Sequence, residues 1–373
     1  MTSRSGGLEG VVAGTSAISS IDGLAGKLTY RGIDIFDLAS DATFEEVAHL
    51  LWHDELPTQS QLDGLLNELS AAYALPPPVV DALRLVPQST PPMDALRSGV
   101  SMLGAFDPDL GDNSLEANAR KSVRLLAQVS AVVATFARLA AGNEPITSAE
   151  GPVADAFLQM YTGERPDETA ARALDVLLVL QADHELNAST FAGRVIAATL
   201  SDMHSAVTGA IGALRGPLHG GANQGVMEML IEIGSPDVAE DWVRERLARR
   251  ELIMGFGHRV YKTADPRATI LRGMSRELSR TSGHPEWFEI SQVIERVMMD
   301  EKGIDSNVDF FSATVYAALG LPVNLFTPIF AMSRTSGWTA HVLEQLGDNR
   351  LIRPRAEYIG HTDRAYTPMA ERG

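Results

Sequence analysis

Two histidines and one aspartate stand in three short segments of this chain that are rich in glycine, proline or asparagine. His219 lies within Gly-Pro-Leu-His-Gly-Gly, His258 follows Gly-Phe-Gly, and Asp309 follows Asn-Val. Glycine and proline beside such groups fix the backbone and let other atoms approach it closely. An acid or base held near hydrogen-bond donors predicts general acid–base catalysis.

Asp309 is the candidate base. Val308 and Phe310 flank it with apolar bulk, which disfavours its charge and makes it a stronger base than a solvated carboxylate. A helix N-cap is the alternative reading, because Asp309 and the polar residues before it precede an apolar helical run.

The two histidines are candidate hydrogen-bond donors. His219 comes just before a predicted helix at residues 223–233, and a helix N-terminus disfavours positive charge, so a neutral imidazole is expected. Such a donor stabilises an oxygen on which charge develops. His258 ends a loop whose glycines let a ligand lie against the backbone, which suits it to polarise a carbonyl. A histidine satisfied by backbone in a tight turn is the alternative for His219.

The stretch from residue 255 to residue 267, Gly-Phe-Gly-His-Arg-Val-Tyr-Lys-Thr-Ala-Asp-Pro-Arg, resembles the signature of the citrate synthase family over its whole length. The resemblance extends from about Gly7 to Gly360. It implies that Asp309 removes a proton from the methyl group of acetyl-CoA and that His219 stabilises the enol. It also implies that His258 polarises the ketone of oxaloacetate.

Arginine suits a dicarboxylate, because its planar fork gives two parallel charge-assisted hydrogen bonds. The resemblance assigns carboxylate binding to Arg267, Arg334 and Arg353, and substrate binding to His184. Taken singly, each would fit a surface or structural ion pair. In the family, the arginine at the position of Arg353 reaches into the neighbouring subunit's site, which implies a homodimer.

Coenzyme A is expected along residues 252–262, with Gly255, Gly257 and backbone groups against the nucleotide and Lys262 near a phosphate; a solvated lysine is the alternative. CoA would be a co-substrate, since the resemblance implies neither a permanently bound cofactor nor a metal. His49 and His53 have the spacing of a metal pair, but no third ligand is evident.

Helical periodicity dominates the chain and predicts an all-α fold. Apolar residues recur every three or four positions in 118–141, 171–180, 241–252, 287–299 and 326–346. Alternation in 15–23 and 27–30 about a glycine-rich turn predicts a small N-terminal β-hairpin, and 76–78, 91–92 and 107–114 are expected loops. By resemblance, residues 1–218 and 322–373 form a large helical domain, residues 219–321 form a small one, and the catalytic groups line the cleft between them.

Composition favours a globular protein of the cytoplasm. The 373 residues exceed the usual size of one core, and 45% of them are hydrophobic and 21% charged. No apolar run approaches the roughly 18 to 20 residues of a membrane span, the start has no signal-peptide pattern, and there is no cysteine. The net charge of −17, without a basic stripe, argues against nucleic acid as a partner.

The sequence therefore predicts a citrate synthase, and two alternatives stay open. A 2-methylcitrate synthase would use propionyl-CoA, and one methylene is worth only about 1 to 3 kcal/mol. Ala313 and Gln181 replace the glycine and histidine common in relatives, which bears on packing and acyl-chain preference. A non-catalytic CoA-binding dimer is the third reading, although the catalytic aspartate and both histidines are retained.

Overall fold

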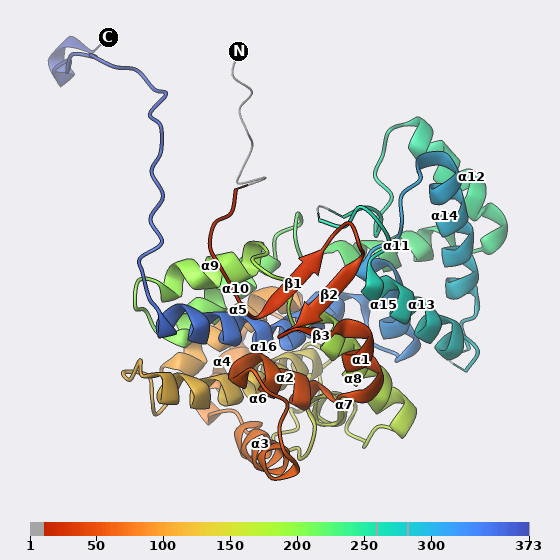
Figure 1. The fold of residues 1–373 in the computed structure, drawn as a ribbon, viewed down its shortest axis with the longest axis horizontal. Helices are drawn as coiled ribbons and strands as arrows, with labels where there is room; N and C mark the ends of the chain where they lie inside the picture. The colour runs from red at the N-terminus through yellow and green to blue at the C-terminus, as the bar shows by residue number, and fades with distance from the viewer. Residues whose placement is uncertain (1–10, 259, 282, 373) are drawn as a thin grey trace.

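The structure is a computed structural model that describes residues 11–258, 260–281 and 283–372 (Figure 1). The start of the chain, where no signal peptide is expected, lies outside these residues. The described residues form 16 α-helices and one three-stranded sheet, which confirms the predicted all-α class. The helices are α1 (Ile35–Asp41), α2 (Phe44–His53), α3 (Gln59–Ala72), α4 (Pro77–Leu85), α5 (Pro92–Gly104), α6 (Leu115–Ala140), α7 (Val153–Thr162), α8 (Glu168–Gln181), α9 (Ala188–Ala197), α10 (Met203–Leu214), α11 (Ala222–Ile233), α12 (Pro236–Ala248), α13 (Pro266–Ser279), α14 (Glu286–Lys302), α15 (Val308–Ala318) and α16 (Phe326–Gly347).

The predicted hairpin is present as β1 (Ser19–Asp22) and β2 (Lys27–Tyr30), and β3 (Ile33–Asp34) extends it to an antiparallel sheet in the order β1-β2-β3. The third strand has only two residues, too few to show alternation. All five periodic segments fall on helices, namely α6, α8, α12, α14 and α16. Each of these helices buries an apolar stripe, which is what the periodicity predicts.

The proline-rich segments at 76–78 and 91–92 were expected to be loops, and this was wrong. Pro77 and Pro92 are the first residues of α4 and α5. The first turn of a helix has no partner for its N–H groups, so proline is accommodated there and its fixed φ favours the helix. Residues 107–114 do form a loop.

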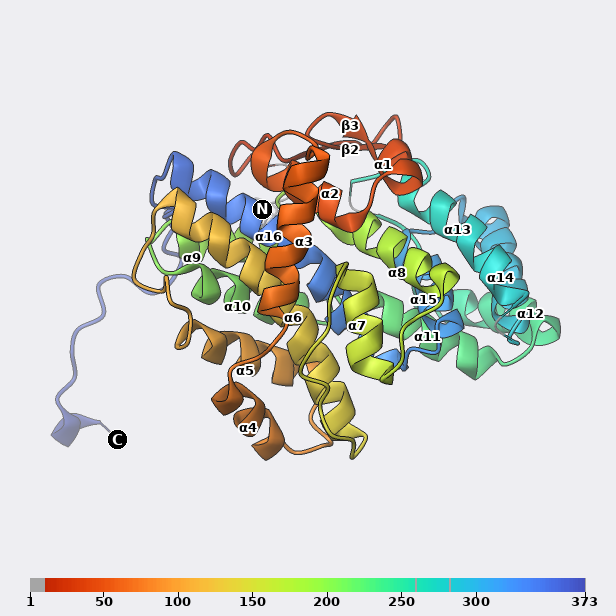
Figure 2. The same ribbon diagram turned by 90° about the horizontal axis from the view of Figure 1, so that it is seen from below.

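The larger group of helices consists of α1 to α10 and α16. Helix α6 runs through the centre of this group and packs against α3, α5, α7 and α16 (Figure 2). Of the described helices, it alone is long and apolar enough to cross a membrane, contrary to the expectation that no segment approaches that limit. However, 67% of the residues in its most apolar window are buried by the surrounding protein. Its composition therefore reflects a core helix.

Helices α11 to α15 pack mainly against one another at one end of the molecule (Figure 1), α13 and α11 on α15, and α12 on α14. At the other end, α16 is buried along most of its length against α6, α9 and α10. After α16 the chain runs away from the helices (Figure 1). Six of the residues predicted to function line a cavity where the two groups of helices meet.

Candidate active site

A cavity of about 620 Å³ lies between the two groups of helices. A larger cavity, of about 1010 Å³, lies beside residues 11–16 and contains none of the predicted site residues. Chemistry rather than size therefore identifies the site. The predicted residues that line the smaller cavity are His184, His219, His258, Arg267, Asp309 and Arg334.

His219 is held at the cavity by Ser189, at the start of α9. Its Nε2 lies 2.9 Å from Ser189 Oγ and 3.3 Å from the Ser189 backbone N, so Ser189 engages Nε2 and Nδ1 is the ring nitrogen left for a ligand. Burial, and secondarily Arg334, lowers the pKa of His219 to about 4. A neutral donor was predicted from the nearby helix N-terminus, but burial is the larger cause.

His258 is a second neutral donor, and backbone contacts fix its tautomer. Its Nδ1 accepts the N–H groups of Val260 and Tyr261 at 3.0 and 3.2 Å, which leaves the proton on Nε2. Burial, and secondarily Arg267, lowers the pKa of His258 to about 4. The loop that carries it is tied to the β1–β2 turn, because the Lys262 N–H donates to the carbonyl of Gly23 at 2.8 Å.

Asp309 is the second residue of α15, and it is not the cap of that helix. Asn307 is the N-cap, and its Oδ1 accepts the Asp309 N–H at 3.0 Å. The Asp309 carboxylate is therefore available to the cavity. Burial raises its pKa to about 6, although Arg267 and Arg334 act in the opposite direction. A carboxyl group with such a pKa is ionised at neutral pH and is a stronger base than usual.

Gly255 and Gly257 do not line the cavity but set the start of α15. The Gly255 carbonyl accepts the Asn307 N–H at 2.9 Å, and the Gly257 carbonyl accepts Asn307 Nδ2 at 3.0 Å. Gly255 has φ of +81°, and a Cβ there would come within 2.8 Å of Phe310. These glycines thereby position the segment that presents Asp309.

Arg267, on α13, is oriented by Asp265, a residue that the sequence reading did not assign a role. Nε and Nη2 of Arg267 donate to the two oxygens of Asp265 at 3.0 and 2.8 Å. Asp265 also accepts the Val308 N–H at 3.2 Å, so one buried carboxylate fixes both the arginine and the first turn of α15. The Asp-Pro-Arg sequence, in which the aspartate is the N-cap of α13, is the sequence signal that could have indicated this role of Asp265.

Arg334, on α16, and His184, after α8, complete the cavity from the other group of helices. Arg334 Nε donates to the Gln181 carbonyl at 2.7 Å, and its guanidinium lies 4.7 Å from the Phe330 ring. Burial lowers the pKa of Arg334 to about 10, so the side chain remains a cation at neutral pH. His184 is buried, its Nε2 has no hydrogen-bond partner among the described residues, and burial lowers its pKa well below the usual value.

Two predicted residues lie away from the cavity. Lys262 is exposed in the loop after His258. Arg353 is exposed in the extended segment after α16 (Figure 1). Neither is brought to the site of its own chain. In the described part of the chain, no group of three His, Asp or Glu side chains has a geometry that could hold a metal ion.

The chain is similar to known proteins over nearly its whole length. Residues 7–355 match the family model described as citrate synthase, C-terminal domain. Citrate synthase 2 of Bacillus subtilis is 49% identical over 368 residues, which cover 98% of both chains. The 2-methylcitrate synthase of Shewanella oneidensis is 42% identical over 368 residues, covering 98% of this chain and 97% of the relative.

Among solved structures, the ternary complex of carboxymethyl coenzyme A and oxaloacetate with citrate synthase from Thermoplasma acidophilum has a TM-score of 0.91 at 35% identity and covers 98% of both chains. The chain therefore belongs to the citrate synthase family. It is an acyltransferase of the type that condenses acetyl-CoA with oxaloacetate, as the sequence predicted.

Proposed function

We propose that the cavity joins the methyl carbon of acetyl-CoA to the ketone carbon of oxaloacetate and that water then cleaves the thioester to release citrate and CoA. The observation that carries the proposal is the convergence of a base with a raised pKa, two neutral imidazole donors and two arginines on one cavity. The balance is acetyl-CoA, oxaloacetate and water to citrate and CoA.

In the proposed mechanism, Asp309 accepts a proton from the methyl group while His219 Nδ1–H donates to the thioester oxygen. Neither group alone makes the carbanion accessible, since the proton acceptor and the oxyanion donor must act together. The enol carbon then attacks oxaloacetate, whose ketone is polarised by His258 Nε2–H. A donor already in place as oxygen charge develops lowers the barrier for both steps.

Oxaloacetate is proposed to bind with its carboxylates at Arg267 and Arg334 and with a polar oxygen at His184. Both arginines are buried, so water competes weakly for their N–H groups. Lys262 and residues 252–262 are proposed to contact CoA, and the support is that Lys262 is exposed in the loop that follows the cavity residue His258.

Acetyl-CoA should be the preferred substrate, as supported by the 49% identity to a protein named citrate synthase against 42% to a 2-methylcitrate synthase. We expect oxaloacetate-dependent release of free thiol with kcat/KM about 10-fold or more above that for propionyl-CoA, as one methylene permits. Parallel initial rates with both thioesters measure this. The reverse preference would identify a 2-methylcitrate synthase, and no turnover with either would favour a CoA-binding sensor.

A homodimer is proposed as the smallest active unit, with Arg353 completing the site of the partner subunit. The support is that Arg353 is exposed and follows α16, and the segment after α16 extends away from the helices (Figure 1). Mixing Arg353→Leu subunits with Asp309→Asn subunits should restore activity, because each heterodimer would contain one intact site. Activity of separately purified and mixed proteins checks this. Inactive mixtures in which heterodimers are shown to form would contradict a shared site.

Oxaloacetate is proposed to close the cavity, with residues 219–321 moving as the small domain. His184 and Arg334 approach oxaloacetate from one group of helices, and Arg267 and His258 approach it from the other. A ligand that bridges them favours the closed state, excludes water and completes the acetyl-CoA site. Small-angle scattering should show compaction with oxaloacetate alone, and calorimetry should show tighter acetyl-CoA binding. Unchanged scattering with independent affinities would indicate a rigid site.

A further inference from the structure

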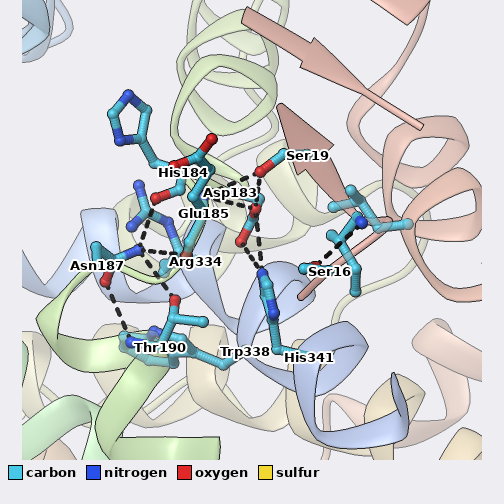
Figure 3. Close-up of polar contacts among 12 residues, drawn as sticks. Ser16, Ser19, Asp183, His184, Glu185, Asn187, Thr190, Arg334, Trp338 and His341 are labelled. Atoms are coloured by element: carbon cyan, nitrogen blue, oxygen red, sulfur yellow. Dashed lines mark hydrogen bonds and ion pairs between the residues drawn. The ribbon is translucent and has the colours of Figure 1, made fainter. Parts of the chain in front are cut away.

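A buried aspartate–histidine pair lies directly behind His184, outside the cavity. Asp183 and His341 are 0% and 1% exposed, and His341 Nε2 lies 3.2 Å from Asp183 Oδ1. Figure 3 shows Asp183 between Ser19 and His341, with the ring of His184 turned to the other side. Neither member of the pair touches the cavity, so neither can be a catalytic residue.

The neighbours of His341 fix its tautomer. Arg194 Nη1 lies 3.1 Å from His341 Nδ1, and a guanidinium can only donate, so Nδ1 accepts. The proton of the neutral ring is therefore on Nε2, which donates to Asp183. Arg194 is in turn paired with Glu344 on the same face of α16. This chain of contacts specifies one orientation for the Asp183 carboxylate.

Asp183 uses Oδ2, the oxygen that also lies 3.3 Å from His341 Nε2 as its hydrogen-bond acceptor, to hold the loop that carries His184. Its Oδ2 accepts from Ser19 Oγ at 2.5 Å and from the Glu185 N–H at 3.2 Å. Glu185 has φ of +52°, a left-handed conformation that is unfavourable for a residue with a side chain. Such a backbone persists only where its surroundings over-determine it. His184 therefore lies between Asp183, which supplies the carboxylate, and Glu185, whose backbone N–H that carboxylate accepts.

The pair also connects the two substrate contacts of this side of the cavity. His341 is on α16, the helix that carries Arg334, while Asp183 precedes His184. Gly337, between Arg334 and His341, lets this contact form, because a Cβ there would lie 2.6 Å from Asp183 Oδ1 and 2.3 Å from the carbonyl of Ala182. The backbone of the His184 loop is thus pressed against α16.

We propose that Asp183 and His341 are positioning residues that set His184 against Arg334 and so determine the affinity for oxaloacetate. The inference rests on the proposed function, because oxaloacetate is the ligand that these two side chains would bind. Preorganisation is the physical reason, since a binding group is effective only when supporting contacts lock its geometry. A contact that merely stabilised the core would affect the free energy of unfolding but not the affinity for oxaloacetate.

The test uses Asp183→Asn, His341→Leu, His341→Gln and the milder Ser19→Ala. In Asp183→Asn, the amide N–H group faces the His341 and Ser19 groups that donate to the native carboxylate. In His341→Leu, the group that donates to Asp183 is removed. We expect both to raise the Kd for oxaloacetate about 10-fold or more, with a smaller increase for Ser19→Ala. Free CoA, titrated without oxaloacetate, should bind with a Kd changed less than about 2-fold. His341→Gln, whose amide N–H can reach Asp183, should recover part of the loss.

Asp175→Asn is the matched control. Asp175 is a buried carboxylate on α8 that accepts the Phe44 N–H at 2.8 Å and pairs with Arg172 at 2.6 Å, away from the cavity. It should leave the Kd for oxaloacetate unchanged. An equal loss of affinity in the control, or unchanged affinity in the Asp183, His341 and Ser19 variants, would overturn the inference. Failure of the wild type to bind oxaloacetate would instead reject the proposed function and this inference with it.

Discussion

Replacing Asp309 by asparagine should lower kcat by about 10²- to 10⁴-fold, the usual contribution of a general base, while oxaloacetate still binds. The amide keeps the shape of the side chain but cannot accept the methyl proton. The Asp309 N–H bond to Asn307 is a backbone contact and is retained. Initial rates and calorimetry with oxaloacetate measure the two effects. A parallel loss of oxaloacetate affinity would assign Asp309 to substrate binding or folding.

The pH dependence follows from the same carboxylate. Its pKa is about 6, and only the ionised form accepts a proton, so kcat/KM for acetyl-CoA should fall below about pH 6 by up to tenfold per unit. His219 and His258, with pKa values of about 4, remain neutral donors over this range. A rate that stayed constant down to pH 5 would argue against Asp309 as the base.

The Asp309→Asn substitution should stabilise the fold at neutral pH. The pKa of Asp309 is about 6 in the folded protein, above the unfolded value of about 3.9, so the contribution of this group to stability is greatest below pH 4 and is lost as pH rises through 6. Two pKa units correspond to about 2 to 3 kcal/mol, which a neutral amide recovers at pH 7. Chemical denaturation at pH 7 measures this, with Asp305→Asn, outside the cavity, as the control.

Replacing Arg334 by leucine should weaken oxaloacetate binding by about 2 to 4 kcal/mol, or roughly 30- to 1000-fold, because a buried carboxylate would lose its charged donors. Arg334 donates to a backbone carbonyl rather than to a carboxylate of the protein, so its removal leaves no carboxylate hydrogen-bond partner unpaired. The KM for oxaloacetate and its Kd by calorimetry check the prediction. A wild-type KM would show that the carboxylate assignment is wrong.

Arg267→Leu provides the comparison. It should also weaken oxaloacetate binding, but it leaves the buried Asp265 carboxylate without its bidentate partner. Breaking a buried pair from one side costs about 3 to 5 kcal/mol of stability. Thermal melts should therefore separate the two variants, with Arg267→Leu much less stable than Arg334→Leu. Equal melting temperatures would contradict the role given to Asp265.

The sequence by itself determined most helices and the identity of the chemical groups. Helical periodicity is a local property, so segments such as 118–141 and 326–346 could be placed without knowing what covers them. The motifs around His219, His258 and Asp309 likewise supply three of the side chains that line the cavity. The loop prediction for residues 76–78 and 91–92 was wrong, because proline is common both in loops and in the first turn of helices.

Only the tertiary structure decided how each group is held and charged. Asn307 rather than Asp309 caps α15, Asp265 orients Arg267, and Ser189 engages Nε2 of His219. Asp183 and His341 meet although 158 positions separate them in the chain. A pKa or a tautomer depends on burial and on partners brought together by packing, and no local pattern in the sequence carries that information.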